Sequence, residues 1–245
     1  MLRCTQHDIK RNTMNIIVTG ASRGIGYELV QLFSKNPENK IVAVSRNKNN
    51  LEKLRQECKQ GNVFTIPFDL NDSSSRNKFI TEIIKQIKTV DILINNAGAL
   101  VNKPFDKITE QELTYMYNVN IISVFELIQS LLPFMGKKHK THIVNISSMG
   151  GFQGSAKFPG LSAYSSSKAA LANLSECLAE EFKEKNIAVN CLCLGAVQTD
   201  MLEEAFPGYQ APVTPIQMAQ FIADFSVNGH NFFNGKVLPV SLSTP

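Results

Sequence analysis

A tyrosine and a lysine four residues apart, Tyr164 and Lys168, are the clearest pair in the chain that could carry out chemistry. In a helix this spacing places both side chains on one face. The unperturbed pKa of tyrosine is near 10, which is too high for acid–base catalysis at neutral pH. A neighbouring ammonium lowers that pKa, so the pair could act as a general acid and base near pH 7. An isolated pair of this kind is more often a surface contact, so its meaning depends on the rest of the chain.

A glycine-rich stretch, Thr19-Gly-Ala-Ser-Arg-Gly-Ile-Gly26, suits the binding of phosphate. It follows a short apolar run and precedes a helical pattern. The free N–H groups at a helix N-terminus attract anions, and glycine lets the backbone approach them closely. The spacing differs from the dinucleotide fingerprint G-x-G-x-x-G, because Leu29 stands where its last glycine would be, and from the P-loop, because no Gly-Lys-Ser/Thr follows. A tight turn without a ligand is the alternative interpretation.

These residues belong to a chain in which strand-like and helix-like stretches alternate. We predict strands at residues 15–18, 40–45, 63–68, 91–95, 141–146, 187–194 and 237–240. We predict helices from the glycine loop to about residue 34 and at about residues 50–59, 73–88, 109–135 and 162–186. Apolar strands that alternate with helices indicate a parallel sheet covered on both faces. The expected fold class is therefore α/β, a Rossmann-type doubly wound parallel sheet of about seven strands.

The length of 245 residues fits one domain, which we place at residues 14–245. Residues 1–13 have neither helical nor strand periodicity, and we interpret them as an N-terminal extension, either disordered or preceding a native start at Met14. They also lack the apolar core of a secretory signal, and no apolar run is long enough to span a bilayer. We therefore expect a cytoplasmic protein without membrane contact.

Composition argues against several other classes. The net charge is +4, and no basic stripe with interleaved aromatic residues suggests a nucleic-acid partner. The five cysteines have no CxxC spacing, and we expect Cys191 and Cys193 to be buried reduced thiols. The four histidines form no HxxxH or HxH pattern, so no metal site is predicted.

Two more motifs complete a set. Asn95-Asn-Ala-Gly98 closes the fourth predicted strand, and Ile146-Ser-Ser148 closes the fifth. With the glycine-rich stretch and the Tyr164–Lys168 pair, they resemble, in order and spacing, the short-chain dehydrogenase/reductase family in its single-domain form. The resemblance covers residues 14–245. It implies a Rossmann fold, a nicotinamide cofactor and an enzyme that acts on C=O or CH–OH groups of a small molecule.

The resemblance implies four catalytic residues: Asn120, Ser148, Tyr164 and Lys168. Ser148 would hold the substrate carbonyl and Tyr164 would exchange its proton. Lys168, with a water held by the asparagine, would take part in the proton relay. Ser147 and Asn118 are the competing choices beside the serine and the asparagine.

The resemblance also implies a set of cofactor contacts. Within the glycine turn they are Gly20, Ser22, Arg23, Gly24, Ile25 and Gly26. After the second, third and fourth strands they are Ser45, Arg46, Asp69, Leu70, Asn96, Ala97 and Gly98, joined by Tyr164, Lys168, Val197 and Thr199. Asp69 would contact the adenine, and Val197 and Thr199 the carboxamide. The chain departs from the family at Leu194, where a proline is usual, so we expect a less rigid nicotinamide loop.

The end of the second strand predicts NADP(H). NAD sites usually carry an acidic residue there, which binds the ribose 2′-hydroxyl. Ser45 takes that place and Arg46 follows it, while Arg23 adds a second guanidinium suited to a phosphate. Two solvated arginines are the alternative. Because cells usually keep NADPH reduced, we expect reduction of a ketone or aldehyde.

The segment from Met201 to about Pro215 is expected to be a short substrate loop. The pocket candidates are Phe152, Phe158, Met201, Leu202, Phe206, Pro207 and Tyr209. Such a pocket suits a small or flat hydrophobic carbonyl, and the residues leave open a 3-oxoacyl-carrier-protein reductase or a reductase of a small ketone, diketone or pteridine. Members of the family commonly pair their long helices, which implies a homodimer or homotetramer. A regulatory protein that binds NADP(H) without turnover is the competing hypothesis.

Overall fold

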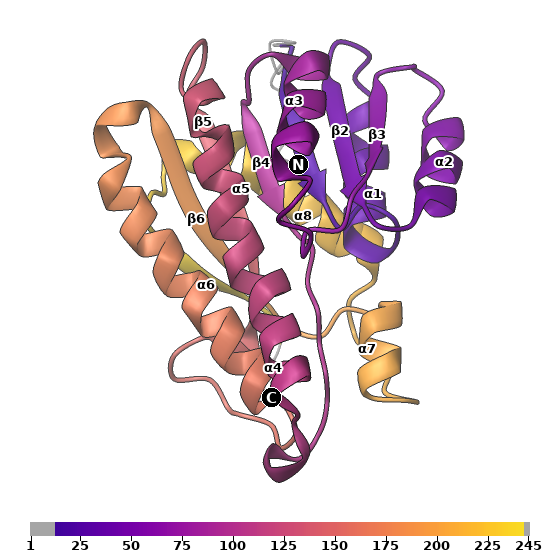
Figure 1. Cartoon of the computed structure of the whole chain (residues 1–245), viewed down its shortest axis with the longest axis vertical. Coiled ribbons are helices and arrows are strands. Elements are labelled where there is room, and N and C mark those ends of the chain that lie inside the picture. Colours follow the sequence, from indigo (N-terminus) through magenta and orange to yellow (C-terminus); the bar gives the residue numbers. More distant parts are fainter. Residues whose placement is uncertain (1–12, 243–245) are drawn as a thin grey trace, which may run out of the picture.

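The computed structural model describes residues 13–242, so residues 1–12 of the predicted extension lie outside it. Its centre is one parallel sheet in the order β3-β2-β1-β4-β5-β6-β7 (Figure 1). The strands are β1 (Asn15–Thr19), β2 (Lys40–Ser45), β3 (Val63–Pro67), β4 (Ile92–Asn95), β5 (Thr141–Ser148), β6 (Ile187–Leu194) and β7 (Val237–Val240). This order confirms the doubly wound Rossmann-type sheet.

Helices cover both faces of the sheet (Figure 1). One face carries α1 (Gly24–Ser34), α2 (Lys48–Glu57) and α8 (Pro215–Asn228). The other carries α3 (Arg76–Ile87), α4 (Glu110–Tyr117), α5 (Ser123–Leu131) and α6 (Ser162–Glu181). The short helix α7 (Asp200–Ala205) stands apart from the sheet, on the side where the site is built. No helix among residues 13–242 is long and apolar enough to cross a membrane.

The core lies in two layers because side chains alternate along each strand. Ile16 and Val18 of β1 pack toward α1 and α8, whereas Ile17 packs on the opposite face toward α3 and α5. All three are fully buried. A parallel strand buried on both faces has no polar side to show, which explains the continuous apolar runs in the sequence.

The predicted helix at 109–135 is interrupted. Thr109 and Glu112 form a capping box that starts α4. A π-helical turn at Asn118–Ile122 then separates α4 from α5. Turns of this kind add a residue to a helix and are frequent at functional sites.

The segment after β6 differs most from expectation. Most of α7 lies within the segment predicted as a loop from Met201, and α8 lies where no helix or strand was predicted. Signals for α8 are present: Thr214 and Gln217 form a capping box, and Pro215 occupies the first helical position. Ile222 of α8 is fully buried against the core that contains α1.

We predict that Ile222→Ala lowers the free energy of unfolding by about 3 kcal/mol, because it leaves a cavity beneath α8. Ile216→Ala, in the first turn of the same helix at 38% exposure, is the matched control and should lower it by less than about 1 kcal/mol. Urea denaturation of both variants measures the difference. An equal decrease in the free energy of unfolding for both variants would mean that Ile222 does not anchor α8 to this core.

Candidate active site

A cleft of about 520 Å³ opens at the carboxyl ends of the strands, around the point where β1 and β4 are neighbours. Ligands of open α/β sheets bind at this kind of junction. Of the predicted catalytic and cofactor-binding residues, all line the cleft except Gly26 and Asn120. The topology therefore brings together residues that are up to 189 positions apart in the sequence, from Gly20 to Tyr209.

The glycine turn forms a cradle that side chains would fill. Gly20 and Gly24 have φ of +69° and +58°, in the left-handed region that favours glycine. A Cβ at Gly20 would lie 2.8 Å from the Cα of Ala97, and one at Gly26 would overlap the carbonyl oxygen of Gly20. Where α1 begins, the backbone is thus closely packed and carries no side chains at these glycines, an arrangement that fits the pyrophosphate of a dinucleotide.

Thr19 and Asn96 fasten this turn to β4. The Asn96 Nδ2 donates hydrogen bonds to the carbonyls of Thr19, at 3.0 Å, and Gly20, at 3.3 Å. In return, the Thr19 Oγ1 accepts from the backbone N–H groups of Asn96 and Ala97, both at 3.1 Å. Thr19 was not among the predicted site residues, although it opens the glycine-rich motif.

The end of β2 presents hydroxyl and guanidinium groups to the cleft. The Ser45 Oγ donates to the Ser22 Oγ at 2.7 Å. Arg46 reaches the hydroxyl of Tyr115 on α4 at 2.9 Å and lies 4.0 Å from the carboxylate of Asp69. Tyr115 was also missed by sequence reasoning, since nothing in the sequence indicates that α4 faces β2 here.

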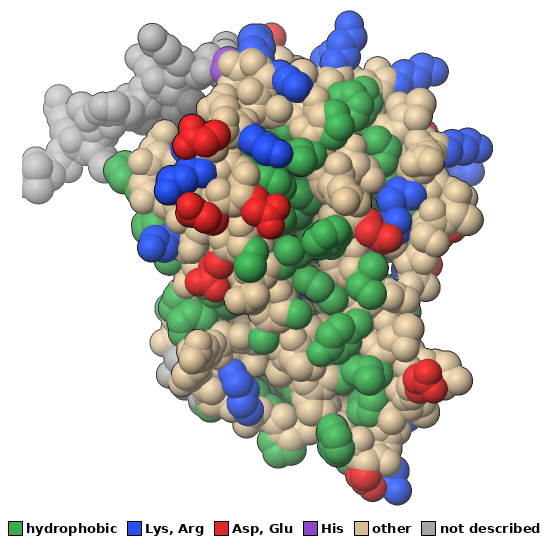
Figure 2. Space-filling model, turned by 60° about the vertical axis from the view of Figure 1, so that its left-hand side comes forward, with side chains coloured by type: hydrophobic (Ala, Val, Ile, Leu, Met, Phe, Trp, Pro, Cys, Tyr) green, Lys and Arg blue, Asp and Glu red, His purple; other side chains and the backbone are tan. Residues whose placement is uncertain are grey.

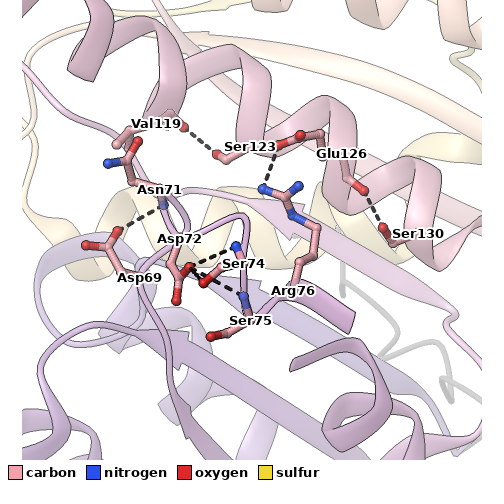
Figure 3. A network of polar contacts seen from close by, with 10 residues as sticks. All are labelled: Asp69, Asn71, Asp72, Ser74, Ser75, Arg76, Val119, Ser123, Glu126 and Ser130. Atoms are coloured by element: carbon pink, nitrogen blue, oxygen red, sulfur yellow. Dashed lines mark hydrogen bonds and ion pairs between the residues drawn. The ribbon is translucent and has the colours of Figure 1, made fainter. Parts of the chain in front are cut away.

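The loop after β3 is stiffened by its own side chains (Figure 3). The Asp69 carboxylate accepts from the backbone N–H of Asn71 at 3.0 Å. Asp72 accepts from the backbone N–H and hydroxyl of Ser74 ahead of α3. Arg76, the first residue of α3, forms an ion pair of 2.6 Å with Glu126 of α5. These contacts fix Asp69 and its neighbour Leu70 on the wall of the cleft.

Tyr164 and Ser148 meet inside the cleft. Tyr164 lies in the first turn of α6 and is buried, and Ser148 ends β5. Burial raises the pKa of Tyr164, and a hydrogen bond with Ser148 opposes that rise. The competing Ser147 turns its hydroxyl to the backbone carbonyl of Lys168 at 2.8 Å. Adjacent strand residues point to opposite faces, which separates the two serines.

Lys168 is buried one turn below Tyr164. Its Nζ donates to the carbonyl of Ile146 at 2.8 Å and lies 6.0 Å from the centre of the Tyr164 ring. Burial lowers the pKa of Lys168 to about 8. In the chain alone, burial raises the pKa of Tyr164, so the expected lowering of that pKa by the ammonium is not met.

Asn120 sits in the π-helical turn behind the cleft. Its Oδ1 accepts from the N–H of Ala99 at 2.8 Å, and its Nδ2 donates to the Ala99 carbonyl and to Ser167, both at 2.9 Å. A Cβ at Gly98 would lie 3.3 Å from the Lys168 Nζ and 3.4 Å from the Asn120 Oδ1. Glycine at 98 therefore leaves the lysine and the asparagine close to each other.

The segment after β6 is held at several points. Leu194 is the last residue of β6, in register with Ser148 and Val240 of the neighbouring strands. The N–H of the following Gly195 donates to the carbonyl of Val240 at 2.9 Å. Further along, Val197 pairs with Val213. Thr199 caps α7, and its methyl group would lie 3.3 Å from a Cβ placed on Gly24.

Apolar side chains line the remainder of the cleft. Of the predicted pocket residues, Phe158, Met201, Leu202, Phe206 and Tyr209 line it. Phe152 and Pro207 do not: Phe152 packs instead on a cluster with Met149 and Ala172. Leu100, Val119, Met149 and Leu161 line the cleft and were missed. Within residues 13–242 no group of three His, Cys, Asp or Glu side chains could hold a metal ion.

Comparison with known proteins agrees with this geometry. The family described as short chain dehydrogenase matches residues 14–210. An uncharacterized oxidoreductase of Staphylococcus saprophyticus is 33% identical over 190 residues, 77% of this chain and 76% of that protein. The 3-oxoacyl-[acyl-carrier-protein] reductase FabG of Chlamydia trachomatis is 28% identical over 237 residues, 91% of this chain and 94% of the relative.

Solved structures share the fold. A dehydrogenase/reductase from Sinorhizobium meliloti has a TM-score of 0.82 and 26% identity, with 93% of each chain covered. A 3-ketoacyl-(acyl-carrier-protein) reductase from Brucella melitensis, complexed with NADH, has a TM-score of 0.83 and 23% identity, covering 94% of this chain and 98% of that one. With the family match over most of its length, the chain belongs to the short-chain dehydrogenase family and is an oxidoreductase that acts on C=O or CH–OH groups.

Proposed function

We propose that the protein is an NADPH-dependent reductase of a ketone or aldehyde, with Tyr164 as the general acid. The observation that carries this proposal is the meeting of Ser148 and Tyr164 in the cleft that also holds the glycine cradle. A carbonyl and a dinucleotide bound in one cleft would be close enough to react. The family match indicates the class of reaction, and the residues that would carry it out line the cleft.

The preference for NADP(H) rests on the end of β2. No carboxylate of β2 stands where one would bind a ribose 2′-hydroxyl, since Ser45 ends the strand. Ser22, Ser45 and Arg46 offer two hydroxyls and a guanidinium along the same wall. These groups suit a 2′-phosphate, whereas a carboxylate there would repel it.

In the proposed mechanism, NADPH supplies the hydride when it is bound in the cleft. Ser148 and Tyr164 donate hydrogen bonds to the carbonyl oxygen and polarise it. Burial raises the pKa of Tyr164, so the phenol keeps its proton at neutral pH and can give it to the oxygen as charge develops there. Reduction of a carbonyl requires an acid beside its oxygen, so a protonated Tyr164 favours the reductive direction.

We propose that Lys168 and Asn120 assist the proton transfer by Tyr164. The buried ammonium stabilises the phenolate that remains after proton transfer. Asn120 and Lys168 both lie against Gly98, and we propose that water held there returns a proton to Tyr164. The asparagine keeps its position because its amide is bound to Ala99 and Ser167.

The apolar wall made by Phe158, Phe206 and their neighbours suits a hydrophobic carbonyl compound as substrate. Several relatives are named 3-oxoacyl-[acyl-carrier-protein] reductases, which makes a 3-oxoacyl thioester a first candidate beside a small ketone, diketone or pteridine. A protein that binds NADP(H) without turnover is the competing proposal, and the presence of Ser148, Tyr164 and Lys168 weighs against it.

We also propose a homodimer or homotetramer in the cytoplasm. Figure 2 shows hydrophobic side chains gathered over the middle of the face that carries α5 and α6. Ile122 and Phe125, at the start of α5, are nearly half exposed. Apolar side chains gathered in this way favour association with another copy. The free thiols Cys58, Cys177, Cys191 and Cys193 are usual for a cytoplasmic protein.

Tyr164→Phe should lower kcat by about a thousandfold while the Kd for NADPH stays within about threefold, because only the transferable proton is lost. NADPH absorbance, followed against an acetoacetyl thioester, diacetyl, an aromatic aldehyde, a quinone and sepiapterin, first identifies a substrate. Tyr117→Phe, the same change outside the cleft, is the control. Near-native turnover of the Tyr164 variant would exclude it as the acid, and tight NADPH binding without turnover of any compound would favour the non-catalytic proposal.

Ser45→Asp should weaken NADPH binding at least about tenfold and strengthen NADH binding, because the new carboxylate repels a 2′-phosphate and accepts from a 2′-hydroxyl. Titration of the fluorescence of each reduced cofactor gives both constants. Ser45→Ala removes the hydroxyl and its contact with Ser22 without adding a charge, so it serves as the control for the carboxylate. A native protein that prefers NADH would contradict the cofactor assignment directly.

Lys168→Met should abolish activity yet raise the free energy of unfolding at pH 7 by about 1 to 3 kcal/mol. Burial lowers the pKa of Lys168 to about 8, so below that pH the folded protein carries a buried charge that the unfolded chain holds at less cost. Native stability should therefore rise with pH between about 8 and 10.4, and the variant should lack this rise. A variant less stable than the native protein would mean that the hydrogen bond to Ile146 outweighs the cost of burial.

A further inference from the structure

Arg23 of the glycine turn is held by two carboxylates of α7. Its Nη1 lies 2.6 Å from Glu204 Oε1 and 3.4 Å from Asp200 Oδ2. The hydrogen bond to Glu204 raises the pKa of Arg23, and the guanidinium lowers the pKa of Glu204. All three side chains are partly exposed to solvent. From the sequence, Arg23 is expected to bind the cofactor phosphate, and no role is predicted for the two carboxylates.

The last residue of α7, Ala205, is held by the segment that follows β4. The Asn102 Nδ2, in the segment after β4, donates to the carbonyl of Ala205 at 2.9 Å. Asp200, Met201 and Leu202 of the same helix line the cleft. The helix therefore connects the glycine turn to the substrate side of the cleft.

The charges at Arg23 do not balance. One guanidinium faces two carboxylates, so the group as a whole carries a net charge of about −1. Because each carboxylate lies within 4 Å of the guanidinium, which is less than the Debye length at physiological salt, screening weakens these two attractions only in part. If Arg23 were to bind a 2′-phosphate with roughly two negative charges, the net negative charge of the group would repel that phosphate.

We propose that Asp200 and Glu204 are specificity-determining residues, which lower the affinity for NADPH relative to NADH by competing for Arg23. This inference rests on the proposed use of NADP(H). A 2′-phosphate that recruits Arg23 releases the carboxylates and thereby loosens α7. Because such coupling is reciprocal, fixing α7 in place weakens NADPH binding by the same factor.

The test is the double variant Asp200→Asn with Glu204→Gln, compared with Glu203→Gln. Glu203 lies on the same helix but accepts a hydrogen bond from the N–H of Gly208, so its change removes one charge without touching Arg23. Fluorescence titration should give NADPH a roughly three- to tenfold lower Kd in the double variant. The Kd for NADH should change less than about twofold, and Glu203→Gln should leave both constants within about twofold.

Equal tightening of NADPH and NADH, or no tightening, would overturn the inference. The native protein tests the proposed function separately. If it prefers NADPH and the double variant keeps the same ratio, only the role of the carboxylates fails. If it shows no preference and the double variant gains none, the NADP(H) assignment fails as well.

Hydrogen exchange of the α7 amides gives a readout apart from affinity. In the native protein NADPH should leave these amides exchanging faster than NADH does, because Arg23 has turned away from Asp200 and Glu204. The double variant should exchange at the same rate with either cofactor. Slower exchange of α7 with NADPH than with NADH in the native protein would mean that the phosphate strengthens the ties of α7, contrary to the proposal.

Discussion

The hydrogen bonds between Thr19 and Asn96 are the constraint on which the site depends. They join the first turn after β1 to the first residues after β4. These strands are neighbours, and the chain leaves them toward opposite faces of the sheet, which opens the cleft between the two connections. Gly20 has no room for a side chain against Ala97, so turn and strand end are locked in close contact. The start of α1, the glycine cradle and the wall carrying Gly98 therefore move as one unit.

A second group of polar residues lies in the core behind this unit. Asn95 donates to Asn145 at 2.8 Å, and Asn145 donates to Ser175 of α6 at 2.8 Å. These two hydrogen bonds link β4, β5 and α6 in one arrangement inside the core. The same helix carries Tyr164 and Lys168. Polar contacts in the core thus set where the tyrosine meets Ser148, although none of these core residues touches the cleft.

The sequence predicts the sheet almost completely, because buried parallel strands are uniformly apolar and the helices between them have a clear period. It also predicts most of the site, because strand ends and the glycine turn can be recognised locally. The parts it missed depend on tertiary contact: Tyr115 across from Arg46, the carboxylates of α7 at Arg23, and the rise of the Tyr164 pKa by burial. The helix α8 is different, because its capping box at Thr214 was available as a local signal and was not used.

The π-helical turn at Asn118–Ile122 shifts the phase of the helix that contains it. An ordinary helix advances about 100° with each residue, so one additional residue rotates everything that follows by that angle. Here the added residue lets Asn120 face Ala99 and Ser167 while Val124 and Leu127 still pack on the sheet. Removing it would give a more regular helix but would turn either the asparagine or the apolar face away. The length of this segment is therefore fixed by geometry as firmly as its sequence.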